Sequence, residues 1–433
     1  MKSTWVDSTN LTQYPRLEEN IKSDVVIIGG GIAGLLTAYI LQNSGISCVV
    51  LEADRICNGI TKNTTAKITM QHNLIYSKLI DEFGKEMAQK YFRANNLAIE
   101  KYKELCQNIE CDFKILPSCV YSLNKPRAIE REARAISELG GSPQIINKIE
   151  VPLRIASAVK VENQAQFNPL KFLKNISENL TIYENTKVTN IKDNVVQTEN
   201  ATVMANKIIV TTHFPFINRR GFYYIKMYQE RSYVLGLENA QNLNAMYIDD
   251  TGKGLTFRED NDLLLIGGYS KRTGDTEGCM EKLRSISKKL YPSSSIKYAW
   301  ATQDCMTPDG IPYIGHYSGS TDDLLVATGF NKWGMTSSMI SAMILSGIVN
   351  NKDDEFREVF SPNRPFLNQK QTYMNVAETF KNMIRPTTKR CSHLGCALKY
   401  NKQEHTWDCP CHGSRFEKSG DIIDNPAKKG ITH

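Results

Sequence analysis

The chain lacks a hydrophobic stretch that reads as a membrane span. Its longest apolar run, Asp24 to Leu41, has 18 residues, but the run starts at an acidic residue and contains a cluster of glycines. The residues before it include Asp7, Glu18 and Glu19 and lack the pattern of a signal peptide. We therefore expect a cytoplasmic protein without a membrane span.

Other signals are also missing. The sequence contains no internal repeat, no low-complexity tract and no pattern typical of a nucleic-acid-binding module, so we expect no nucleic-acid partner. Its net charge is only +7 over 433 residues, of which 41% are hydrophobic and 23% charged. These values are typical of a globular chain with room for two substantial lobes and a tail.

Cysteines are present, but not as the framework of a small secreted protein. Seven of the eleven are scattered and read as buried thiols: Cys48, Cys57, Cys106, Cys111, Cys119, Cys279 and Cys305. The other four lie in the last 43 residues, where Cys391-Ser-His393 is followed after fifteen residues by Cys409-Pro-Cys411-His412, with Cys396 between them. Each of the two short loops thus offers one cysteine and one histidine.

Two thiolates on one iron and two imidazoles on the other hold a Rieske [2Fe–2S] centre. With Pro410, Gly413 and Ser414 in place, the two loops resemble those of the Rieske iron–sulfur family. A tetrahedral zinc site could use the same four side chains, but zinc knuckles usually pair cysteine with cysteine and histidine with histidine. The predicted cluster ligands are Cys391, His393, Cys409 and His412.

The Rieske resemblance implies further roles. High-potential Rieske proteins have a disulfide where this chain has Cys396 and Cys411, although a pair in a reducing compartment could instead be a redox-labile dithiol. Ser414 matches the serine that donates to a cluster sulfide, whereas Phe416 stands where those proteins have a tyrosine. The missing hydroxyl predicts a potential in the lower half of the Rieske range of about −150 to about +300 mV.

The tail is short for a complete Rieske domain. Residues 366–385 read as a helix or linker, which leaves residues 386–433 for a minimal Rieske domain that lacks the strands usually found before the first ligand loop. A segment of about 50 residues cannot bury a large core alone. We expect the cluster and the neighbouring domain to supply much of its stability.

A dinucleotide-binding pattern lies near the start of the chain. A β-branched strand from Asp24 leads into Gly29-Gly-Gly31-Ile-Ala-Gly34 and a helix, so that backbone can approach a pyrophosphate at the helix N-terminus. A second strand, Ser47 to Leu51, ends in Glu52, 18 residues after Gly34, where a carboxylate can accept from ribose hydroxyls. NAD and FAD both use this pattern.

The downstream segments favour FAD. A Thr/Ala-rich segment (Thr61 to Lys67), returning strands (Leu180 to Val188 and Asn194 to Thr212) and a second strand–glycine–helix block (Asp323 to Thr336) follow in this order. Together they resemble the glycine oxidase and D-amino-acid oxidase family of FAD-dependent oxidoreductases. The FAD-binding residues that this resemblance implies are Gly29, Gly30, Gly31, Ile32, Ala33, Gly34, Glu52, Thr61, Ala66, Val188, Thr211, Gly329, Lys332, Gly334, Met335 and Thr336.

The resemblance implies an α/β fold, with a Rossmann-type FAD-binding domain and a β-rich (α+β) substrate lobe, followed by the small Rieske subdomain. We expect the oxidoreductase over residues 1–365, with FAD-binding segments at about 20–75, 175–215 and 300–350. The substrate lobe should occupy about 76–174 and 216–299. No second dinucleotide pattern is present, so hydride is expected to come from the substrate itself rather than from NAD(P)H.

Some family members attach FAD covalently through a histidine in the segment after the second strand. Asn63 occupies that position, which favours noncovalent FAD, although the nearby His72 could substitute. For the substrate, family members grip a carboxylate with an arginine, usually joined by a tyrosine. Arg231, Tyr233 and Arg258 lie on the corresponding segments and are the candidates, although arginines are common on strand edges and surface or lobe-packing roles are the stronger alternative.

Three classes of function remain to be weighed. The first is a flavin dehydrogenase that takes electrons from a small amine or amino acid and passes them through the Rieske cluster to an external acceptor. The second, a Rieske oxygenase, needs a mononuclear iron held by two histidines and a carboxylate, and the five remaining histidines are too widely separated to supply them. The third is a non-enzymatic redox sensor or electron-transfer module, which leaves the large substrate lobe unexplained.

The charge of the tail bears on the acceptor. The segment from Arg385 to His433 has nine Lys or Arg against five Asp or Glu. Such a surface suits an acidic electron-transfer protein, or it simply keeps a small tail solvated. We predict the flavin dehydrogenase, with FAD and a [2Fe–2S] cluster as cofactors.

Overall fold

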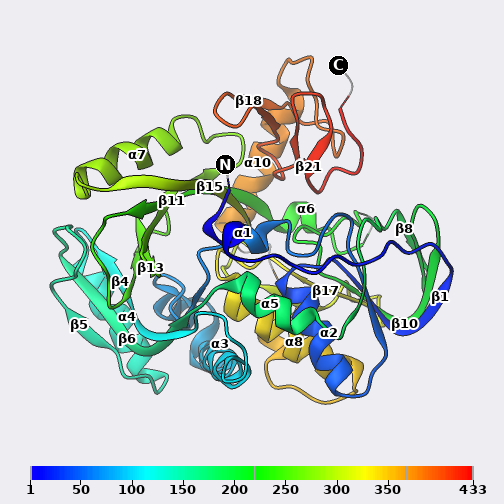
Figure 1. The fold of residues 1–433 in the computed structure, drawn as a ribbon, viewed down its shortest axis with the longest axis horizontal. Helices are drawn as coiled ribbons and strands as arrows, with labels where there is room; N and C mark the ends of the chain where they lie inside the picture. The colour runs from blue at the N-terminus through cyan, green and yellow to red at the C-terminus, as the bar shows by residue number, and fades with distance from the viewer. Residues whose placement is uncertain (1, 219, 366–368, 432–433) are drawn as a thin grey trace.

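A computed structural model describes residues 2–218, 220–365 and 369–431. Three sheets organise the molecule (Figure 1). A mostly parallel sheet with helices lies on one side, a larger mixed sheet lies beside it, and a small antiparallel sheet near the C-terminus packs above both. This arrangement is the predicted combination of a Rossmann-type domain, a β-rich lobe and a small C-terminal subdomain.

The parallel sheet has the order β16-β17-β10-β1-β2-β7, and the hairpin β8–β9 extends from β10. Its central strand β1 is buried on both faces from Val25 to Ile28, as expected for a β-branched run between helices. The strand bounds are β1 Ile21–Ile28, β2 Cys48–Leu51, β7 Thr181–Tyr183, β8 Asn190–Lys192, β9 Val195–Gln197, β10 Thr202–Val210, β16 Tyr313–His316 and β17 Leu324–Thr328.

The larger sheet has the order β15-β11-β14-β13-β12-β4-β6-β3, with β5 paired to β6. Strands β11, β14 and β15 are long and antiparallel, so successive side chains along each of them point to opposite faces. The bounds are β3 Lys67–Ile68, β4 Lys114–Ser122, β5 Gln144–Ile146, β6 Ser157–Gln166, β11 Tyr228–Glu238, β12 Met246–Asp249, β13 Thr256–Asp260, β14 Leu263–Arg272 and β15 Ser295–Met306.

Helices cover the two larger sheets. Helix α2, which follows β1, packs on α8, and both helices are apolar nearly all round because they lie in the interior. The bounds are α1 Thr4–Ser8, α2 Ile32–Asn43, α3 Ile75–Cys106, α4 Pro126–Glu138, α5 Pro169–Ser177, α6 Tyr223–Lys226, α7 Cys279–Leu290, α8 Gly334–Val349 and α9 Arg357–Phe360, with a 3-10 helix at Ile60–Asn63.

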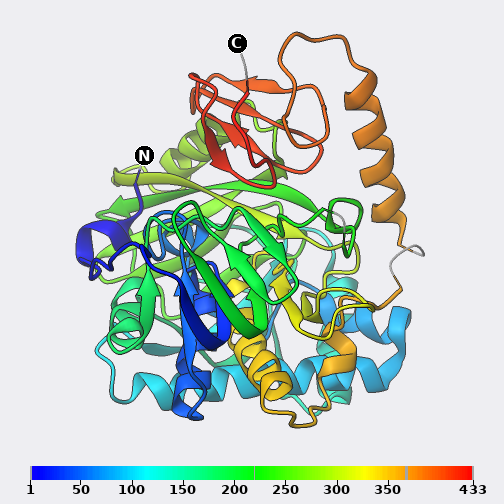
Figure 2. The ribbon, with the colours of Figure 1, turned by 90° about the vertical axis from the view of Figure 1, so that its right-hand side faces the viewer.

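The C-terminal subdomain follows α10 (Lys370–Ile384), which lies at the edge of the molecule (Figure 2). Four short strands form its sheet: β18 Lys399–Asn401, β19 Thr406–Asp408, β20 Arg415–Phe416 and β21 Ile422–Asp424. Its core is a small cluster of side chains, in which Phe416 is fully buried among four cysteines. This small core agrees with the expectation that the subdomain depends on its neighbour.

Within the residues that the structure describes, no helix combines the length and the apolar character needed to cross a bilayer. The apolar run from Asp24 to Leu41 is instead divided into strand β1, a glycine turn and helix α2. The cytoplasmic location itself stays a prediction.

Candidate functional site

The glycine turn after β1 brings a strand and a helix together at a distance that excludes side chains. Gly29 has a φ of +112°, and a Cβ there would lie 2.9 Å from the carbonyl oxygen of Thr211. A Cβ on Gly34 would collide with the carbonyl oxygen of Gly29. Thr211 closes the turn, because its hydroxyl donates to the carbonyls of Ile28 and Gly29 at 3.0 Å each. Because glycines have no side chains, the turn leaves the backbone at the N-terminus of α2 uncovered, as a pyrophosphate site requires.

Glu52 and Thr61 surround this turn. The Glu52 carboxylate accepts from the backbone N–H of Gly30 at 2.7 Å and of Asp54 at 2.9 Å. Burial raises the pKa of Glu52, while these backbone N–H groups act to lower it. The Thr61 hydroxyl oxygen accepts from the backbone N–H of Ile32 at 3.1 Å, at the start of α2. These residues fit the adenosine and pyrophosphate end of FAD.

The second glycine block lies at the carboxyl end of β17. Gly329, Asn331 and Lys332 all have positive φ values, of 71°, 50° and 73°, so the chain turns sharply before α8 begins at Gly334. A Cβ on Gly329 would lie 3.2 Å from the sulfur of Met227. A helix N-terminus exposed after such a turn favours negative charge, which fits the reduced flavin ring.

Met335 and Thr336, also predicted near the flavin, contact helix α3 and the loop before it. The Tyr102 hydroxyl donates to the Met335 carbonyl at 2.9 Å, and the Thr336 hydroxyl lies 3.1 Å from His72 Nε2. Val188 lies in the loop after β7, packed against the core of the parallel sheet. The buried residue Ala66, with a φ of 52°, adjoins β3.

His72 is buried and has partners at both ring nitrogens. Nδ1 lies 2.7 Å from the Tyr91 hydroxyl, Nε2 lies 3.0 Å from the Thr69 carbonyl, and the ring stacks on Trp333 with centroids 4.7 Å apart. Burial lowers the pKa of His72 to about 3, so the ring is neutral. These contacts describe a packed structural histidine and give no support to covalent attachment through it.

The sheet of β11, β14 and β15 presents a charged cluster toward the second glycine block, residues 323–336, which we call the flavin block. The Lys332 ammonium donates to the Glu230 carboxylate at 2.8 Å, to the Ser270 hydroxyl at 2.6 Å and to the Gly252 carbonyl at 3.0 Å. Asp304 stands opposite Glu230 in the β11–β15 ladder. Burial raises the pKa of Asp304 to about 6, with Lys332 acting in the opposite direction. We call Glu230, Ser270, Asp304 and Lys332 the acidic cluster.

The predicted substrate residues do not lie in the acidic cluster. Arg231 and Tyr233 lie one and three positions after Glu230 on β11. Because side chains alternate along a strand, both point to the face of the sheet opposite to Glu230. There Arg231 Nε donates to the Glu404 carboxylate at 2.6 Å, and the Tyr233 hydroxyl donates to it at 3.1 Å. These two side chains therefore meet the C-terminal subdomain rather than the flavin block.

Arg258 is fully enclosed. Its Nη1 donates to the carbonyls of Thr65, Ala66 and Phe167 at 2.7, 3.1 and 3.3 Å, and its guanidinium lies over the Trp5 ring at 5.2 Å. Burial lowers the pKa of Arg258 to about 10. These contacts fix the segment between the 3-10 helix at Ile60–Asn63 and β3, and they leave the substrate role of Arg258 a prediction without support from its surroundings.

The four predicted cluster ligands come together. Cys391 and Cys409 are buried, with exposures of 3% and 1%, and their thiols interact with each other. The rings of His393 and His412 lie 5.1 Å apart between centroids. Among the residues that the structure describes, His393 Nδ1 and His412 Nε2 are buried without a hydrogen-bond partner, whereas His393 Nε2 lies 3.0 Å from the Asn218 amide oxygen. Two thiols and two buried, unpartnered ring nitrogens fit the donor set of a Rieske cluster.

A disulfide between Cys396 and Cys411 joins the two ligand loops, at the pair that the Rieske resemblance implied. The sulfur atoms of Cys396, Cys411 and Cys409 lie within 4.8 Å of one another, so the disulfide adjoins a predicted ligand. Ser414 is fully buried, accepts from the Ala427 N–H at 3.0 Å and interacts with the Cys391 thiol. The two loops are thus fixed before any metal is considered.

Three side chains of the larger sheet hold the second ligand loop by its backbone carbonyls. Gln229 donates to the His412 carbonyl at 2.7 Å, Gln303 donates to the Gly413 carbonyl at 2.9 Å, and Arg272 donates to the Cys411 carbonyl at 2.7 Å. Gly413 has a φ of 86°, and a Cβ there would lie 2.5 Å from the Gln229 Cβ. The ligand loop therefore lies in direct contact with β11.

The subdomain is also anchored by the segment beside the second glycine block. Asn425 donates to the carbonyls of Thr212 and Phe214 at 2.9 and 2.7 Å. Between these two, the His213 carbonyl accepts from the Thr328 hydroxyl at the end of β17. His213 is a non-glycine residue at a φ of 64°, and its buried Nε2 has no hydrogen-bond partner in the structure as described. This segment directly joins the flavin block to the C-terminal subdomain.

The sequence interpretation missed Glu230, Asp304, Glu404, Asn218 and His213. Successive side chains of a strand point to opposite faces, so the predicted strand could have placed Glu230 and Arg231 on opposite sides of the sheet. Nothing in the sequence indicated which face the tail would cover. Contacts such as Asn218 with His393 join residues 175 positions apart and have no local signal.

The fold and the two sites define a flavoprotein with an attached Rieske-type iron–sulfur centre. The chain belongs to the FAD dependent oxidoreductase family, whose model matches residues 24–348, and the Rieske [2Fe-2S] domain model matches residues 355–433. FAD and the [2Fe–2S] cluster are thereby confirmed as its cofactors, and the zinc alternative is set aside. The Rieske match begins before α10, which we had assigned to a linker.

A relative covers nearly the whole chain. A Rieske 2Fe-2S iron-sulfur protein of Bacillus subtilis, YhfW, is 36% identical over 99% of this chain and 96% of its own length. The cytochrome b6-f complex iron-sulfur subunit 1 of a Nostoc species is 42% identical over 10% of this chain and 23% of its own length.

Solved structures show the same fold. Glycine oxidase from Geobacillus kaustophilus has a TM-score of 0.68 and 17% identity, covering 79% of this chain and 99% of its own. L-proline dehydrogenase from P. horikoshii has a TM-score of 0.67 and 18% identity, covering 80% of this chain and 98% of its own. At these identities the likeness supports the oxidoreductase fold alone.

Proposed function

We propose that the chain oxidises a small amine or amino acid at FAD and passes the electrons to its Rieske cluster and on to an external acceptor. The observation that carries the proposal is the contact of the second ligand loop with Gln229 and Gln303. These residues lie on the strands whose opposite faces carry Glu230 and Asp304. One sheet thus separates the acidic cluster from the iron–sulfur ligands.

The substrate class rests on the acidic cluster and on the fold neighbours. The names of glycine oxidase and L-proline dehydrogenase both refer to amino acids. Two carboxylates around one ammonium leave the cluster with a net negative charge when both are ionised, which attracts a cationic amine.

FAD, when bound, supplies the acceptor for a hydride from the substrate carbon. The chain's own residues prepare the substrate. Glu230 is held by Lys332 and Ser270, so it offers a fixed negative charge. Asp304, with its pKa raised to about 6, can take a proton from an ammonium group near neutral pH. The neutral amine that remains is the form able to deliver hydride.

For the acceptor we propose an acidic electron-transfer protein that docks on the basic C-terminal subdomain. The nine Lys or Arg from residue 385 onward support this class of partner. The rate of acceptor reduction should then fall as ionic strength rises, since exposed charges are screened over about 10 Å at 0.1 M salt. A rate that is indifferent to salt excludes this partner.

The test is an anaerobic absorption and EPR experiment with a panel of amino acids and secondary amines. We expect one compound to bleach the flavin and to produce a Rieske-type EPR signal in the same sample. A Cys409→Ser variant, checked for folding by circular dichroism, is the control and should show flavin bleaching without the EPR signal. Bleaching without cluster reduction in the wild type would refute the internal electron path, and no bleaching by any amine would refute the substrate class.

A further inference from the structure

Helix α10 is oriented opposite to the usual amphipathic arrangement. Its buried side chains are polar: Thr372, Asn375 and Asn382. Asn375 accepts from Arg272 Nη1 at 2.9 Å, and the Asn382 carbonyl accepts from the Ala397 N–H at 2.9 Å. The polar side of the helix is therefore the side that holds it against the sheet and the C-terminal subdomain.

The outward side of α10 is apolar. Tyr373, Phe380 and Ile384 are each 65% exposed, and their spacing of seven and four residues places them on one stripe of the helix. The other large exposed apolar side chains of α10 are Met374, Val376 and Met383. Six such residues on a helix of 15 make most of its exposed side apolar, and monomeric surfaces rarely expose so much apolar area in one place. We call it the α10 face.

Basic side chains border the α10 face. Residues 370–390 contain five Lys or Arg against one Glu, and Lys370, Lys381, Arg385 and Arg390 are exposed. Lys381 approaches the one carboxylate, Glu378, at 3.7 Å. An apolar stripe with aromatic residues and a basic border is the composition of helices that lie in the interface of anionic membranes.

Charge and length decide among the possible occupants of the α10 face. A second copy of the chain would bring two basic borders together, which costs energy. An anionic lipid surface offers the opposite charge and takes up apolar side chains at the same time. At 15 residues, α10 is shorter than the roughly 20 that a span requires.

We propose that α10 docks the protein flat on the surface of an anionic lipid bilayer, with the α10 face in the headgroup region and its basic border against lipid phosphates. Figure 2 shows α10 at the periphery, beside the C-terminal sheet, where a surface can reach it. The proposal stands apart from the proposed function, because binding to lipid is measured without substrate or acceptor.

The experiment is vesicle co-sedimentation of the full-length holoprotein. Vesicles of phosphatidylcholine alone are compared with vesicles that also contain phosphatidylglycerol. We expect binding to the anionic vesicles to exceed binding to the neutral ones at least about tenfold and to weaken at high salt. A wild-type protein that binds neither vesicle, or both equally, overturns the proposal.

Matched variants separate the α10 face from general hydrophobicity. The double variant Phe380→Glu/Ile384→Glu should lose binding at least about tenfold. The control Leu123→Glu/Ile145→Glu makes the same changes at positions that are 52% and 50% exposed outside α10 and should bind as wild type does. Equal loss in both variants overturns the proposal. So does a wild-type dimer, seen by analytical ultracentrifugation, that the α10 variant dissociates, because the face would then cover a second copy.

Discussion

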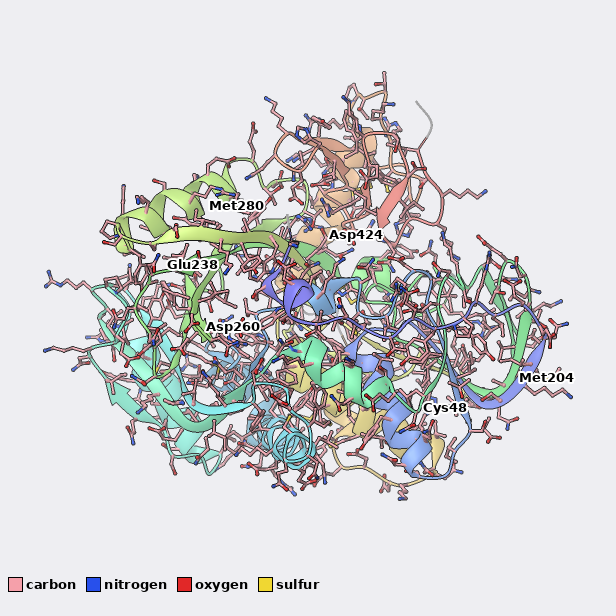
Figure 3. The ribbon with its side chains drawn as sticks, viewed as in Figure 1. Cys48, Met204, Glu238, Asp260, Met280 and Asp424 are labelled. Atoms are coloured by element: carbon pink, nitrogen blue, oxygen red, sulfur yellow. A yellow bond between two sulfur atoms is a disulfide. The ribbon has the colours of Figure 1, made fainter. Side chains whose placement is uncertain are left out.

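Arg231 of β11 and Glu404 of the C-terminal subdomain form an ion pair in which both side chains are almost fully buried, at 7% and 5% exposure. Arg415 donates to the same carboxylate at 2.9 Å and to Asp408 at 3.1 Å. Arg415 also reaches Asp424, which is labelled in Figure 3, at 3.1 Å. Burial acts to raise the pKa of Glu404, but Arg231 and then Arg415 outweigh it, so the pKa is lowered.

Replacement of Glu404 by glutamine should destabilise the protein strongly. The change leaves two buried guanidinium groups short of a carboxylate, which typically costs about 3 to 5 kcal/mol. Urea denaturation, monitored by the visible spectrum of the cluster and by far-UV circular dichroism, measures the loss. The exposed pair of Lys402 with Glu277, 4.0 Å apart, provides the control: Glu277→Gln should change the free energy of unfolding by less than about 0.5 kcal/mol.

The buried pair of Asp309 and Arg364 should contribute stability that depends on pH. Burial acts to raise the pKa of Asp309, but the Arg364 guanidinium, at 2.6 Å from Oδ2, lowers it below its usual value. A lowered pKa gives stability that is complete above the unfolded value near 4 and lost as the pH falls through the folded value. The advantage of wild type over Asp309→Asn should therefore be constant from pH 5 to 7 and shrink below about pH 4. An advantage that grows on acidification contradicts this.

Asp304 should control the rate at which an amine reduces the flavin. Its pKa of about 6 means that the basic form appears as the pH rises through 6. Stopped-flow flavin reduction in single turnover should accelerate through this range in wild type, and Asp304→Asn should lose the dependence and slow by about 10²-fold. Because a raised pKa makes the ionised carboxyl costly, the same variant should be more stable than wild type above pH 6. Unchanged kinetics in the variant exclude the proton-accepting role.

Gly413 and Gly395 form a matched pair for testing the contact of the ligand loop with β11. Both have positive φ, at 86° and 76°, but only Gly413 has a neighbour where a Cβ would lie. Alanine at Gly395 should cost about 1 to 2 kcal/mol from backbone strain alone. Alanine at Gly413 should add displacement of Gln229 and reduce the iron content of the purified protein. Similar iron content in the two variants would contradict a role for the contact between Gly413 and Gln229 in holding the cluster.

The cluster potential provides a further prediction. We expect the reduction potential of the cluster to lie in the lower half of the Rieske range, because Phe416 lacks the hydroxyl of the tyrosine that stands there in high-potential Rieske proteins. Phe416→Tyr should raise the potential, and Ser414→Ala should lower it, each by about 40 mV if one hydrogen bond of about 1 kcal/mol is involved. Redox titration followed by EPR measures both. A wild-type value near the top of the range would contradict the role given to Phe416.

Local sequence patterns predicted the elements that local chemistry specifies. The glycine turn at Gly29 lies in one short segment, and the structure has it there, between β1 and α2. The periodicity from Glu86 to Leu105 reads as a helix in the sequence, and this segment lies inside α3, which starts earlier, at Ile75. Residues 80–140 read as helices in the sequence, and this interpretation is wrong at strand β4, whose alternation is weak and whose pairing to β6 contains a bulge.

The face that each side chain presents could not be predicted in the same way. Arg231 and Glu230 are neighbours in sequence, and which of them points to the flavin block depends on the position of the whole sheet. Likewise residues 366–385 read as a helix or linker, and nothing in their sequence indicated that α10 would bury its polar side. Such features depend on contacts between segments separated by a hundred residues or more.

The contact of Gly413 with Gln229 limits how the protein can be taken apart. The oxidoreductase sheet supports the ligand loop through Gln229, Gln303 and Arg272. The C-terminal subdomain is therefore not a portable module. Grafted onto another flavoprotein, it would lose the three side chains that hold its second ligand loop by the backbone.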